Sequence, residues 1–410
     1  MEELKIACVG AGNSGISHMV LFEKYLPGCI KAYSDLSSLH FNNHFQENNY
    51  DFLRNDFKDI PYYINAEEMI CSCEINTLII STYCVDHFNY VKLAVKYKLN
   101  ILLEKPIAIN ERDIEECYEL LKDYPKIVSV NFTMKAAPVS LAAKENIKNG
   151  VIGGIVSVQY VNNVHYGDEY FRKWMRTKGK VGDLFLQKAT HDFDIINSII
   201  GLKPLRISAF GSRKVYGGEK PDSLKCDGCD EKYSCSMSVY YLNRASGKSI
   251  PPEHMRYCVY ANEIDIDDNH TVIIQYEDGV TVSYSQVFNV PTQSTKRGGV
   301  FIGTKGVMEL NYYNKFIETY DHKELICNSK IKITKLDQKP GSVKEDVFDW
   351  AGNSHFDGTE NGILEKIKLL SGENAEVKNS IREGYISAKM CIAAQESIEK
   401  KQTVEINLNL

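Results

Sequence analysis

The expected fold follows from residues 5–15, which read KIACVGAGNSG. Residues 5–9 form a short apolar run typical of a buried strand, and residues 16–25 have helical periodicity. In such a turn the first glycine permits a tight bend, the second lets a pyrophosphate approach the backbone, and the third lets helix and strand pack closely. Free N–H groups at the helix start then face the anion. The residues predicted to bind a dinucleotide here are Gly10, Gly12, Asn13, Ser14 and Gly15.

An acidic residue closes the next predicted strand. Residues 30–34 run into Asp35, whose carboxylate can accept hydrogen bonds from the adenosine ribose hydroxyls. The same carboxylate would repel a 2′-phosphate, and residues 36–38 (Leu-Ser-Ser) offer no cation to hold one. The pattern therefore favours NAD over NADP. The alternative is a surface aspartate at the end of a strand.

Strands and helices continue to alternate after Asp35. Residues 77–81 and 101–103 are predicted strands, and residues 87–98 and 111–122 are predicted helices. This alternation indicates a doubly wound parallel sheet, an α/β Rossmann domain spanning residues 1–128. Ligands bind at the carboxyl ends of such strands, so the side chains after them should face the cofactor. These are Thr82, Tyr83, Glu104 and Lys105.

Length and charge limit the possible classes of protein. A chain of 410 residues exceeds one ordinary core, so we expect a second domain over residues 129–410. The formal net charge is −6 and no basic stripe is present, which argues against a nucleic-acid partner. The apolar runs are too short for a membrane span. Residues 1–5 do not resemble a signal peptide, so we expect a cytoplasmic protein.

Glu104-Lys105-Pro106, about ninety residues after the glycine turn, makes the chain resemble a known family. The resemblance is to the glucose–fructose oxidoreductase, inositol dehydrogenase and rhizopine-catabolism (Gfo/Idh/MocA) family, and it extends nearly end to end. It implies that Lys105 lies beside the nicotinamide and handles the proton of a substrate hydroxyl. A partly desolvated lysine near a cation has a lowered pKa, which suits this task. The alternative is a surface lysine before a loop proline. The other matching positions are Thr82, His87, residues 174–176, residues 188–194 and residues 303–306.

A second catalytic element is expected in residues 184–194, which have the character of a helix. Lys188, His191 and Asp194 follow one another at a spacing of three, so neighbours in the series share a face. His191 matches the active-site histidine of the family. Many sugar dehydrogenases of the family have an aspartate where this chain has Gln187, which puts an aspartate–histidine proton relay in doubt. Gln187 can orient a hydroxyl, and Lys188 becomes a second candidate for the proton.

Further substrate contacts are expected from scattered positions. The face of Trp174 suits the apolar side of a pyranose, and Arg176 suits a carboxylate, phosphate or sulfonate. Core packing for Trp174 and a surface charge for Arg176 are the alternatives. The resemblance adds Lys135, in place of an arginine that the family often has, and His355, from a loop whose glycines are depleted here.

Four of the twelve cysteines have the spacing of metal ligands. They follow the pattern C-x2-C-x5-C-x22-C, inside a segment of about residues 217–258 that has little core material of its own. Four thiolates can hold a structural zinc ion, and the same ligands can hold an iron–sulfur cluster. Free thiols remain the third possibility. The predicted ligands are Cys226, Cys229, Cys235 and Cys258.

The rest of the second domain is predicted to be α+β, with strands at 155–161, 205–212, 271–276, 281–287 and 300–302 and a hairpin turn at 277–279. The resemblance implies a large open, mainly antiparallel sheet whose outer face forms homo-oligomers, dimers or tetramers. The helix at 383–400 and the strand at 403–408 are expected to pack on the N-terminal domain.

The leading functional hypothesis is an NAD-dependent oxidoreductase that acts on a sugar, inositol or related polyol. Hydride would move between a ring carbinol and the nicotinamide while Lys105 and His191 manage the hydroxyl proton. The alternative is an NAD-dependent glycoside hydrolase, in which transient oxidation at C3 permits elimination, hydration and re-reduction. A non-catalytic sensor is disfavoured because Lys105 and His191 are both present.

Overall fold

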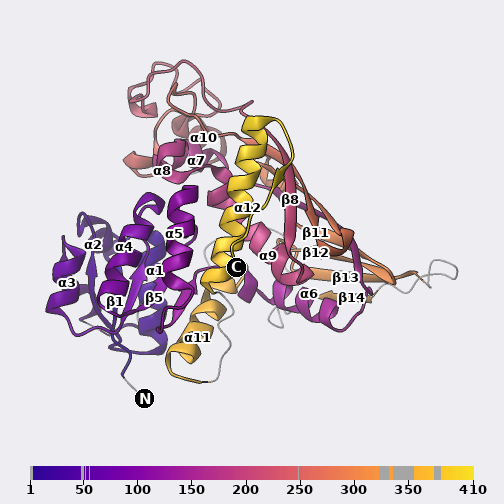
Figure 1. Cartoon of the computed structure of the whole chain (residues 1–410). Helices are drawn as coiled ribbons and strands as arrows, with labels where there is room; N and C mark the ends of the chain where they lie inside the picture. Colours follow the sequence, from indigo (N-terminus) through magenta and orange to yellow (C-terminus); the bar gives the residue numbers. More distant parts are fainter. Residues whose placement is uncertain are drawn as a thin grey trace.

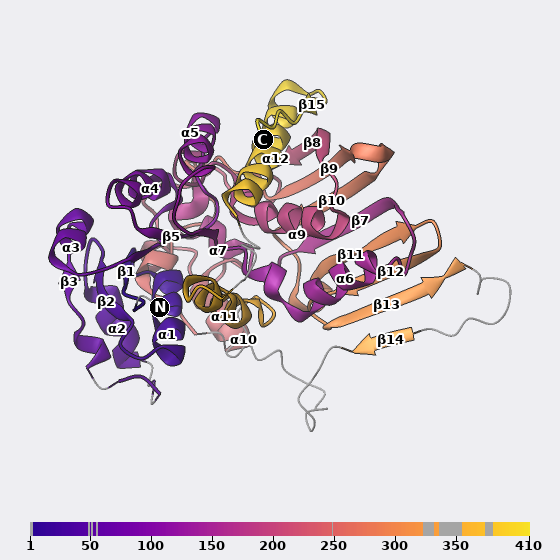
Figure 2. The same cartoon turned by 60° about the horizontal axis from the view of Figure 1, so that its bottom comes forward.

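The computed structural model describes residues 3–47, 50, 52–54, 56–247, 249–322, 332–335, 355–373 and 380–410 (Figure 1). Two sheets dominate these residues. The N-terminal sheet and its helices form one half, and a larger sheet with the C-terminal helix forms the other (Figure 2). No helix in the described ranges is long and apolar enough to cross a membrane.

The first sheet has six parallel strands in the order β3-β2-β1-β4-β5-β6. The chain winds outward from β1 in both directions, which confirms the predicted doubly wound α/β fold. All four residues of β1 and of β4 are buried, as expected for strands covered on both faces. The strands are β1 (Ile6–Val9), β2 (Ile30–Ser34), β3 (Tyr62–Tyr63), β4 (Thr77–Ile80), β5 (Asn100–Leu103) and β6 (Val128–Val130), and the helices are α1 (Asn13–Tyr25), α2 (Leu39–Glu47), α3 (Ala66–Ser72), α4 (His87–Lys96) and α5 (Glu111–Leu121).

The second sheet has nine strands in the order β14-β13-β12-β11-β7-β10-β9-β8-β15. Only β7 and β10 pair in parallel among these, so the predicted mainly antiparallel sheet is confirmed. The strands are β7 (Ile155–Asn163), β8 (Pro204–Ser212), β9 (Asn269–Tyr276), β10 (Thr281–Val287), β11 (Lys296–Gly303), β12 (Gly306–Asn311), β13 (Phe316–Asp321), β14 (Lys332–Lys335) and β15 (Val404–Glu405).

In the part of the chain that the structure describes, one face of the nine-stranded sheet carries helices and the other does not (Figure 2). The covering helices are α6 (Pro138–Lys148), α9 (Thr190–Ile200) and α12 (Ile381–Lys400). On the opposite face Phe210 of β8 and Ile273 of β9 are 73% and 49% exposed. Two large apolar side chains are therefore exposed on the outer face of the sheet.

The C-terminal segment reaches both halves. In α11 (Gly358–Leu370), Lys366 is buried and donates to Asn131 next to β6. Lys389 of α12 pairs with Glu111 and Glu115 of α5. The prediction that the final strand packs on the N-terminal domain is wrong, because β15 pairs with β8 in the second sheet.

The segment between β8 and β9 contains the cysteine-rich insertion and the helix α10 (Val239–Ser246). It lies beside two short helices, α7 (Asp168–Phe171) and α8 (Lys178–Val181), at the top of Figure 1. Its anchor is a small core to which Phe171, Tyr216, Val259 and Phe288 contribute.

Candidate active site

The glycine turn is held by close backbone packing. Gly10 has φ +88°, and a Cβ there would lie 2.4 Å from the carbonyl oxygen of Ser81. A Cβ on Gly15 would lie 2.0 Å from the carbonyl oxygen of Gly10. A Cβ on Gly12, in contrast, would meet no atom of the described residues within 4 Å. The first and third glycines are therefore needed by the fold, and the second leaves room for a ligand.

The surroundings of this turn fit a dinucleotide. Asn13 begins α1, so the first backbone N–H groups of the helix have no partner within it and can bind an anion. Asp35 follows β2 and accepts a hydrogen bond of 2.6 Å from the N–H of Ala11 in the turn. Its carboxylate thus lies beside the glycines, where the ribose of NAD would bind. The side chain of Asn13 contacts His40 at 3.0 Å.

Glu104 ties the end of β5 to α1. It accepts hydrogen bonds from Ser14 and from Asn131 (2.6 Å), and His18 lies 2.8 Å from the same oxygen. Burial alone would raise the pKa of Glu104, but the hydrogen bond and charge of His18, with Ser14 and Lys105, outweigh it and hold the pKa below its usual range. Ser14 and Glu104, both predicted cofactor residues, therefore bind each other.

His87 joins the ends of β4 and β5. Its ring nitrogens lie 2.7 Å from the carbonyl of Pro106 and 3.2 Å from that of Thr82. Burial lowers the pKa of His87, so the ring is neutral and can donate to only one of the two. This contact fixes the loops that carry Thr82 and Lys105. Tyr83 is half-exposed beside them.

Lys105 meets the second domain at a π-helical turn, Phe185–Ala189, that leads into α9. Its Nζ donates to the backbone carbonyl of Gln187 at 2.8 Å. The amide of Gln187 donates to Cys84 at 3.0 Å. Burial lowers the pKa of Lys105, with the charges of Lys188 and Arg297 acting in the same direction. The predicted helix is present, but its first turn is a π turn, a geometry often found at functional sites.

Lys188 lies one residue further along the same turn. It is buried, donates to the hydroxyl of Tyr166 and lies 4.7 Å from the centre of that ring. Burial, aided by the charge of Arg297, lowers the pKa of Lys188 to about 7. A lysine with this pKa is partly neutral near pH 7 and can accept a proton.

His191 is buried, and its ring lies 5.5 Å from that of His355 and 6.1 Å from that of Phe132. Burial and the charge of Lys105 lower the pKa of His191 well below its usual value. Its Nδ1 has no hydrogen-bond partner among the residues described. Burial, with the charge of Lys188, lowers the pKa of His355 to about 3. The structure thus brings together two predicted site residues 164 positions apart, 355 − 191, both as neutral imidazoles.

The acidic residues of α9 support the helix. The carboxylate of Asp192 accepts hydrogen bonds from Arg297, Asn162 and Tyr284. Asp194 pairs with Lys135 at 3.0 Å, and Lys135 also pairs with Glu383 at 3.1 Å. Asp194 therefore does not share a hydrogen bond with His191, and Lys135 is engaged by carboxylates of the protein.

The turn Trp174–Arg176 lies between the two halves. The ring of Trp174 lies 4.6 Å from that of Tyr83. Arg176 is buried and donates to Glu263 and to the backbone carbonyls of Asp222 and Cys258. Trp174 thus stays near the predicted cofactor residues, whereas Arg176 is bound by the insertion.

Sequence reasoning missed several partners at this site. Tyr166, Arg297 and Cys84 contact or influence the two lysines, yet none lies in a recognisable motif. Tyr166 follows β7, Arg297 lies in β11 and Cys84 follows β4. The sequence gives no signal that these three segments meet.

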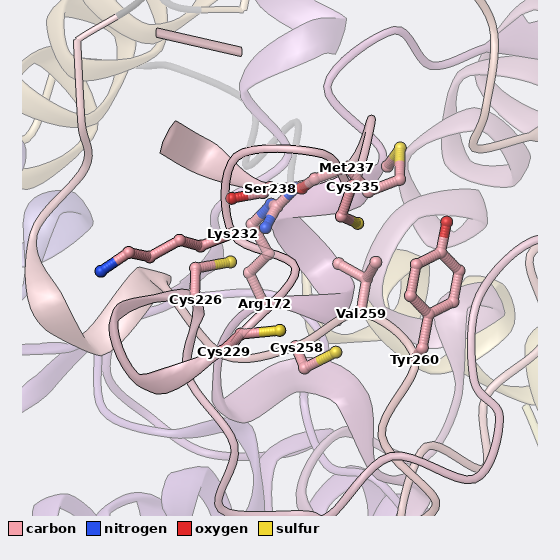
Figure 3. Close-up of a pocket in the computed structure, with 10 residues that line it drawn as sticks. All are labelled: Arg172, Cys226, Cys229, Lys232, Cys235, Met237, Ser238, Cys258, Val259 and Tyr260. Carbon is pink, nitrogen blue, oxygen red and sulfur yellow. The ribbon is translucent and has the colours of Figure 1, made fainter. Parts of the chain in front are cut away.

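The four predicted metal ligands line one cavity in the insertion (Figure 3). As they stand, the described residues include no group of three or more His, Cys, Asp or Glu side chains arranged to hold a metal ion. The predicted metal is therefore not shown.

Comparisons with known proteins identify related sequences. YteT of Bacillus subtilis (strain 168), named as an oxidoreductase, is 26% identical over 273 residues, 61% of this chain and 63% of YteT. The 2,7-anhydro-N-acetylneuraminate hydratase of Mediterraneibacter gnavus is 24% identical over 165 residues, 38% of this chain and 44% of the hydratase. The chain spans less than two thirds of the length of both relatives.

Solved structures share the fold. Levoglucosan dehydrogenase in complex with NADH and levoglucosan has a TM-score of 0.74 and 16% identity, covering 99% of this chain and 100% of that one. An oxidoreductase domain protein from Kribbella flavida has a TM-score of 0.75 and 14% identity, covering 100% of both chains.

Family comparison covers both halves of the chain. Residues 4–132 match the oxidoreductase family's NAD-binding Rossmann fold. Residues 144–406 match the C-terminal alpha/beta domain of the same family. The chain belongs to the Gfo/Idh/MocA family of NAD-binding oxidoreductases.

Proposed function

We propose that this enzyme is an NAD-dependent dehydrogenase of a sugar, inositol or related polyol. The observation that carries the proposal is the contact between Lys105 and the carbonyl of Gln187, which places a buried amine of the Rossmann half against the turn that carries Lys188 and precedes His191. When bound along the glycine turn, NAD supplies the hydride acceptor. The chain supplies the groups that hold and deprotonate a hydroxyl.

The two lysines are suited to accept the hydroxyl proton. Burial lowers the pKa of both Lys105 and Lys188, and the value for Lys188 is about 7. Such amines can remove a proton near neutral pH as hydride leaves the carbinol carbon. Burial lowers the pKa of His191 and keeps the ring neutral, and its Nδ1 has no partner among the described residues, so we assign it to orientation of the hydroxyl through Nδ1.

The nature of the relatives supports a carbohydrate substrate. Levoglucosan dehydrogenase, which shares the fold, is a sugar dehydrogenase crystallised with NADH and its sugar. The ring of Trp174 beside Tyr83 offers an aromatic surface near the proposed nicotinamide position. Aromatic rings of this kind suit the apolar side of a pyranose.

The test is to incubate the enzyme with NAD and a panel of sugars, inositols and sugar alcohols and to follow NADH absorbance. We expect at least one substrate to give steady NADH formation, at a rate that Lys105→Ala lowers by roughly two to four orders of magnitude. The proposal fails if NAD binds in calorimetry but no polyol of the panel yields NADH or any other product.

The glycoside hydrolase mechanism is the second candidate. Gln187 replaces the relay aspartate, and its amide is bound to Cys84, which leaves a lysine-based site suited to repeated proton transfers. The relative from Mediterraneibacter gnavus is named as a hydratase, and addition of water without net oxidation is the kind of reaction that this candidate requires. Chromatography of products from p-nitrophenyl glycosides separates the two candidates, because cleavage without accumulated NADH supports the hydrolase.

We also propose that the outer face of the nine-stranded sheet joins copies of the chain. Phe210 and Ile273 lie on the adjacent antiparallel strands β8 and β9 and are both exposed on this face. An exposed apolar patch of this kind typically marks an interaction surface. Light scattering should give a dimer or tetramer, and Phe210→Asp should shift it toward the monomer.

A further inference from the structure

The insertion contains a small pocket. Its volume is about 20 Å³, and its lining includes the side chains of all four spaced cysteines. Figure 3 shows the sulfur atoms of Cys226, Cys229 and Cys258 turned toward the interior of the insertion. A space of this size holds one small atom or ion.

The backbone brings the cysteines to this space from three separate turns. Lys225 and Tyr257 form an antiparallel bridge, so Cys226 lies opposite Arg256 and Cys258 opposite Leu224, and the two cysteines occupy diagonal positions on one face of this pair. A single 3-10 turn, Cys226–Gly228, carries the chain on to Cys229. Cys235 ends a turn closed by its N–H on the carbonyl of Glu231 at 2.8 Å. The convergence therefore depends on main-chain hydrogen bonds as well as on sequence spacing.

Arg172 of the neighbouring segment gives an independent indication of negative charge in the cavity. It lines the same space and is 2% exposed. Its Nε donates to Asp168 at 2.8 Å and its Nη2 to the carbonyl of Met237, but Nη1 has no acceptor among the described residues. A buried guanidinium N–H without an acceptor is costly. Thiolates in the cavity would supply that acceptor.

The insertion buries few side chains of its own. Within the described part of residues 217–258, only Cys226, Ser238 and Val239 are buried. So small a core cannot offset the entropy of ordering some forty residues. Loops of this composition gain most from a bound ion that crosslinks them.

We propose that this cavity is a structural zinc site in which four thiolates hold one Zn²⁺ tetrahedrally, a role that goes beyond the proposed dehydrogenase reaction. The side chains line the space without yet forming a ligand set, so binding requires them to rotate toward a common centre, with Zn–S distances of about 2.3 Å. Arg172 and Lys232, which also lines the cavity, offset part of the negative charge. The ligands are Cys226, Cys229, Cys235 and Cys258.

Zinc and an iron–sulfur cluster would both use the four cysteine thiolates, but a cluster adds several iron and sulfide atoms between them. A single ion needs only the convergence of the four sulfur atoms, and the iron and sulfide content of the purified protein distinguishes the two.

The ion would also support the active site from a distance. Arg176 donates to the backbone carbonyl of Cys258, and its neighbour Trp174 contacts Tyr83. A fixed Cys258 therefore fixes Arg176 and, through the same short turn, the aromatic surface next to the cofactor residues. The zinc site has a positioning role and takes no part in hydride or proton transfer.

The test is elemental analysis of the full-length enzyme, purified without chelators. We expect about one zinc and almost no iron per chain. Cys229→Ser should lose the zinc and lower the melting temperature, whereas Cys71→Ser, at an exposed cysteine of α3, should change neither. Replacement of zinc by Co²⁺ should give the intense near-ultraviolet thiolate charge-transfer bands of a tetrahedral site, a readout that does not require a stable variant.

Two results would overturn the zinc assignment. Iron and sulfide in equal amounts would identify a cluster in its place. Metal-free protein that takes up neither Zn²⁺ nor Co²⁺, and in which the thiols of the insertion react freely with an alkylating reagent in the folded state, would show that the cavity holds no ion.

Discussion

The glycine turn between β1 and α1 and the cysteine-rich insertion both hold candidate binding groups on irregular backbone. Around the turn, Cys8, Val9 and Ala11 are at most 2% exposed, and backbone atoms of neighbouring strands pack directly on Gly10 and Gly15. Inside the insertion, the buried residues described are few, and three of the four cysteines are only half-buried. The turn is shaped by the core of its domain, while the insertion is held mainly by hydrogen bonds.

This difference bears on how each site is maintained. The cofactor turn forms whenever the six-stranded sheet forms, because its atoms are part of the packing of that sheet. The insertion can loosen without disturbing either sheet, since its contacts with them are confined to a small satellite core. Damage to the first region should therefore be felt in folding and chemistry, and damage to the second in local order and substrate affinity.

The largest expected effect is on chemistry. Lys105→Ala removes a buried amine that contacts the π turn, and we expect kcat to fall by roughly two to four orders of magnitude. NAD affinity should change little, because the glycine turn and Asp35 are untouched. Steady-state kinetics and calorimetry measure the two quantities. A variant with near-normal kcat would remove Lys105 from the proposed proton path.

A pair of glycine variants tests the packing of the turn. Gly15→Ala places a Cβ 2.0 Å from the carbonyl oxygen of Gly10, so we expect a loss of about 1–3 kcal/mol in the free energy of unfolding. Gly12→Ala meets no atom of the described residues within 4 Å, and its effect on folding should be limited to the poorer N-cap, about 0.5–1 kcal/mol. It should nevertheless weaken NAD binding by about tenfold or more, because the methyl group occupies the approach of the pyrophosphate. Chemical denaturation and calorimetry distinguish the two; equal stability losses would contradict the proposed division of roles.

The preference for NAD over NADP should correspond to a smaller free-energy difference than the loss of catalysis in Lys105→Ala. We expect NAD to bind at least about tenfold more tightly than NADP, or roughly 1.4 kcal/mol, because the carboxylate of Asp35 repels a 2′-phosphate. Asp35→Asn keeps an acceptor for the N–H of Ala11 but removes the charge, so the preference should narrow without loss of stability. Calorimetric titration with both cofactors measures this, and equal affinity in the unchanged enzyme would refute it.

The parts that could be predicted from the sequence are those in which neighbouring residues act together. The glycine turn and Asp35 belong to one strand–turn–helix unit, and local rules assign them. The alternation of strands and helices likewise gives the doubly wound sheet. Lys105 and His191 needed the family resemblance as well, because a single lysine or histidine has no distinctive local pattern.

The parts that could not be predicted depend on distant contacts. The π turn at Phe185–Ala189 contains Lys188, so the regular helical spacing assumed between Lys188 and His191 does not hold, whereas His191 and Asp194 both lie in α9. Asp194 forms an ion pair with Lys135, a residue 59 positions earlier (194 − 135), and not with His191. The partner of a buried charge depends on geometry and desolvation across the whole fold. The spacing of residues along the sequence does not encode either of these.

A pH dependence should distinguish Lys188 from the other candidates. Its pKa of about 7 in the folded enzyme lies below the ordinary value of 10.5, so the neutral amine that accepts a proton is gained as the pH rises through 7. We expect kcat/KM to rise through about pH 7 and Lys188→Met to lose this limb. Between pH 7 and about 10 the unfolded chain binds the extra proton, so stability rises with pH in the enzyme but less in the variant. An unchanged activity profile in Lys188→Met would assign the proton to Lys105.

The smallest effect concerns Arg176 and decides between two roles for it. Because its guanidinium binds Glu263 and the carbonyls of Asp222 and Cys258, we expect Arg176→Gln to loosen the insertion and raise KM only about twofold to fivefold, with kcat nearly constant. Glu263→Gln should have a similar effect, since it weakens the same contact from the other side. If Arg176 instead bound an anionic group of the substrate, its loss would raise KM far more for acidic sugars than for neutral ones. Glu263→Gln would then leave KM unchanged or lower it, because the guanidinium would be released toward the substrate. Parallel kinetics of the two variants on neutral and acidic sugars therefore show whether this arginine serves the insertion or the substrate.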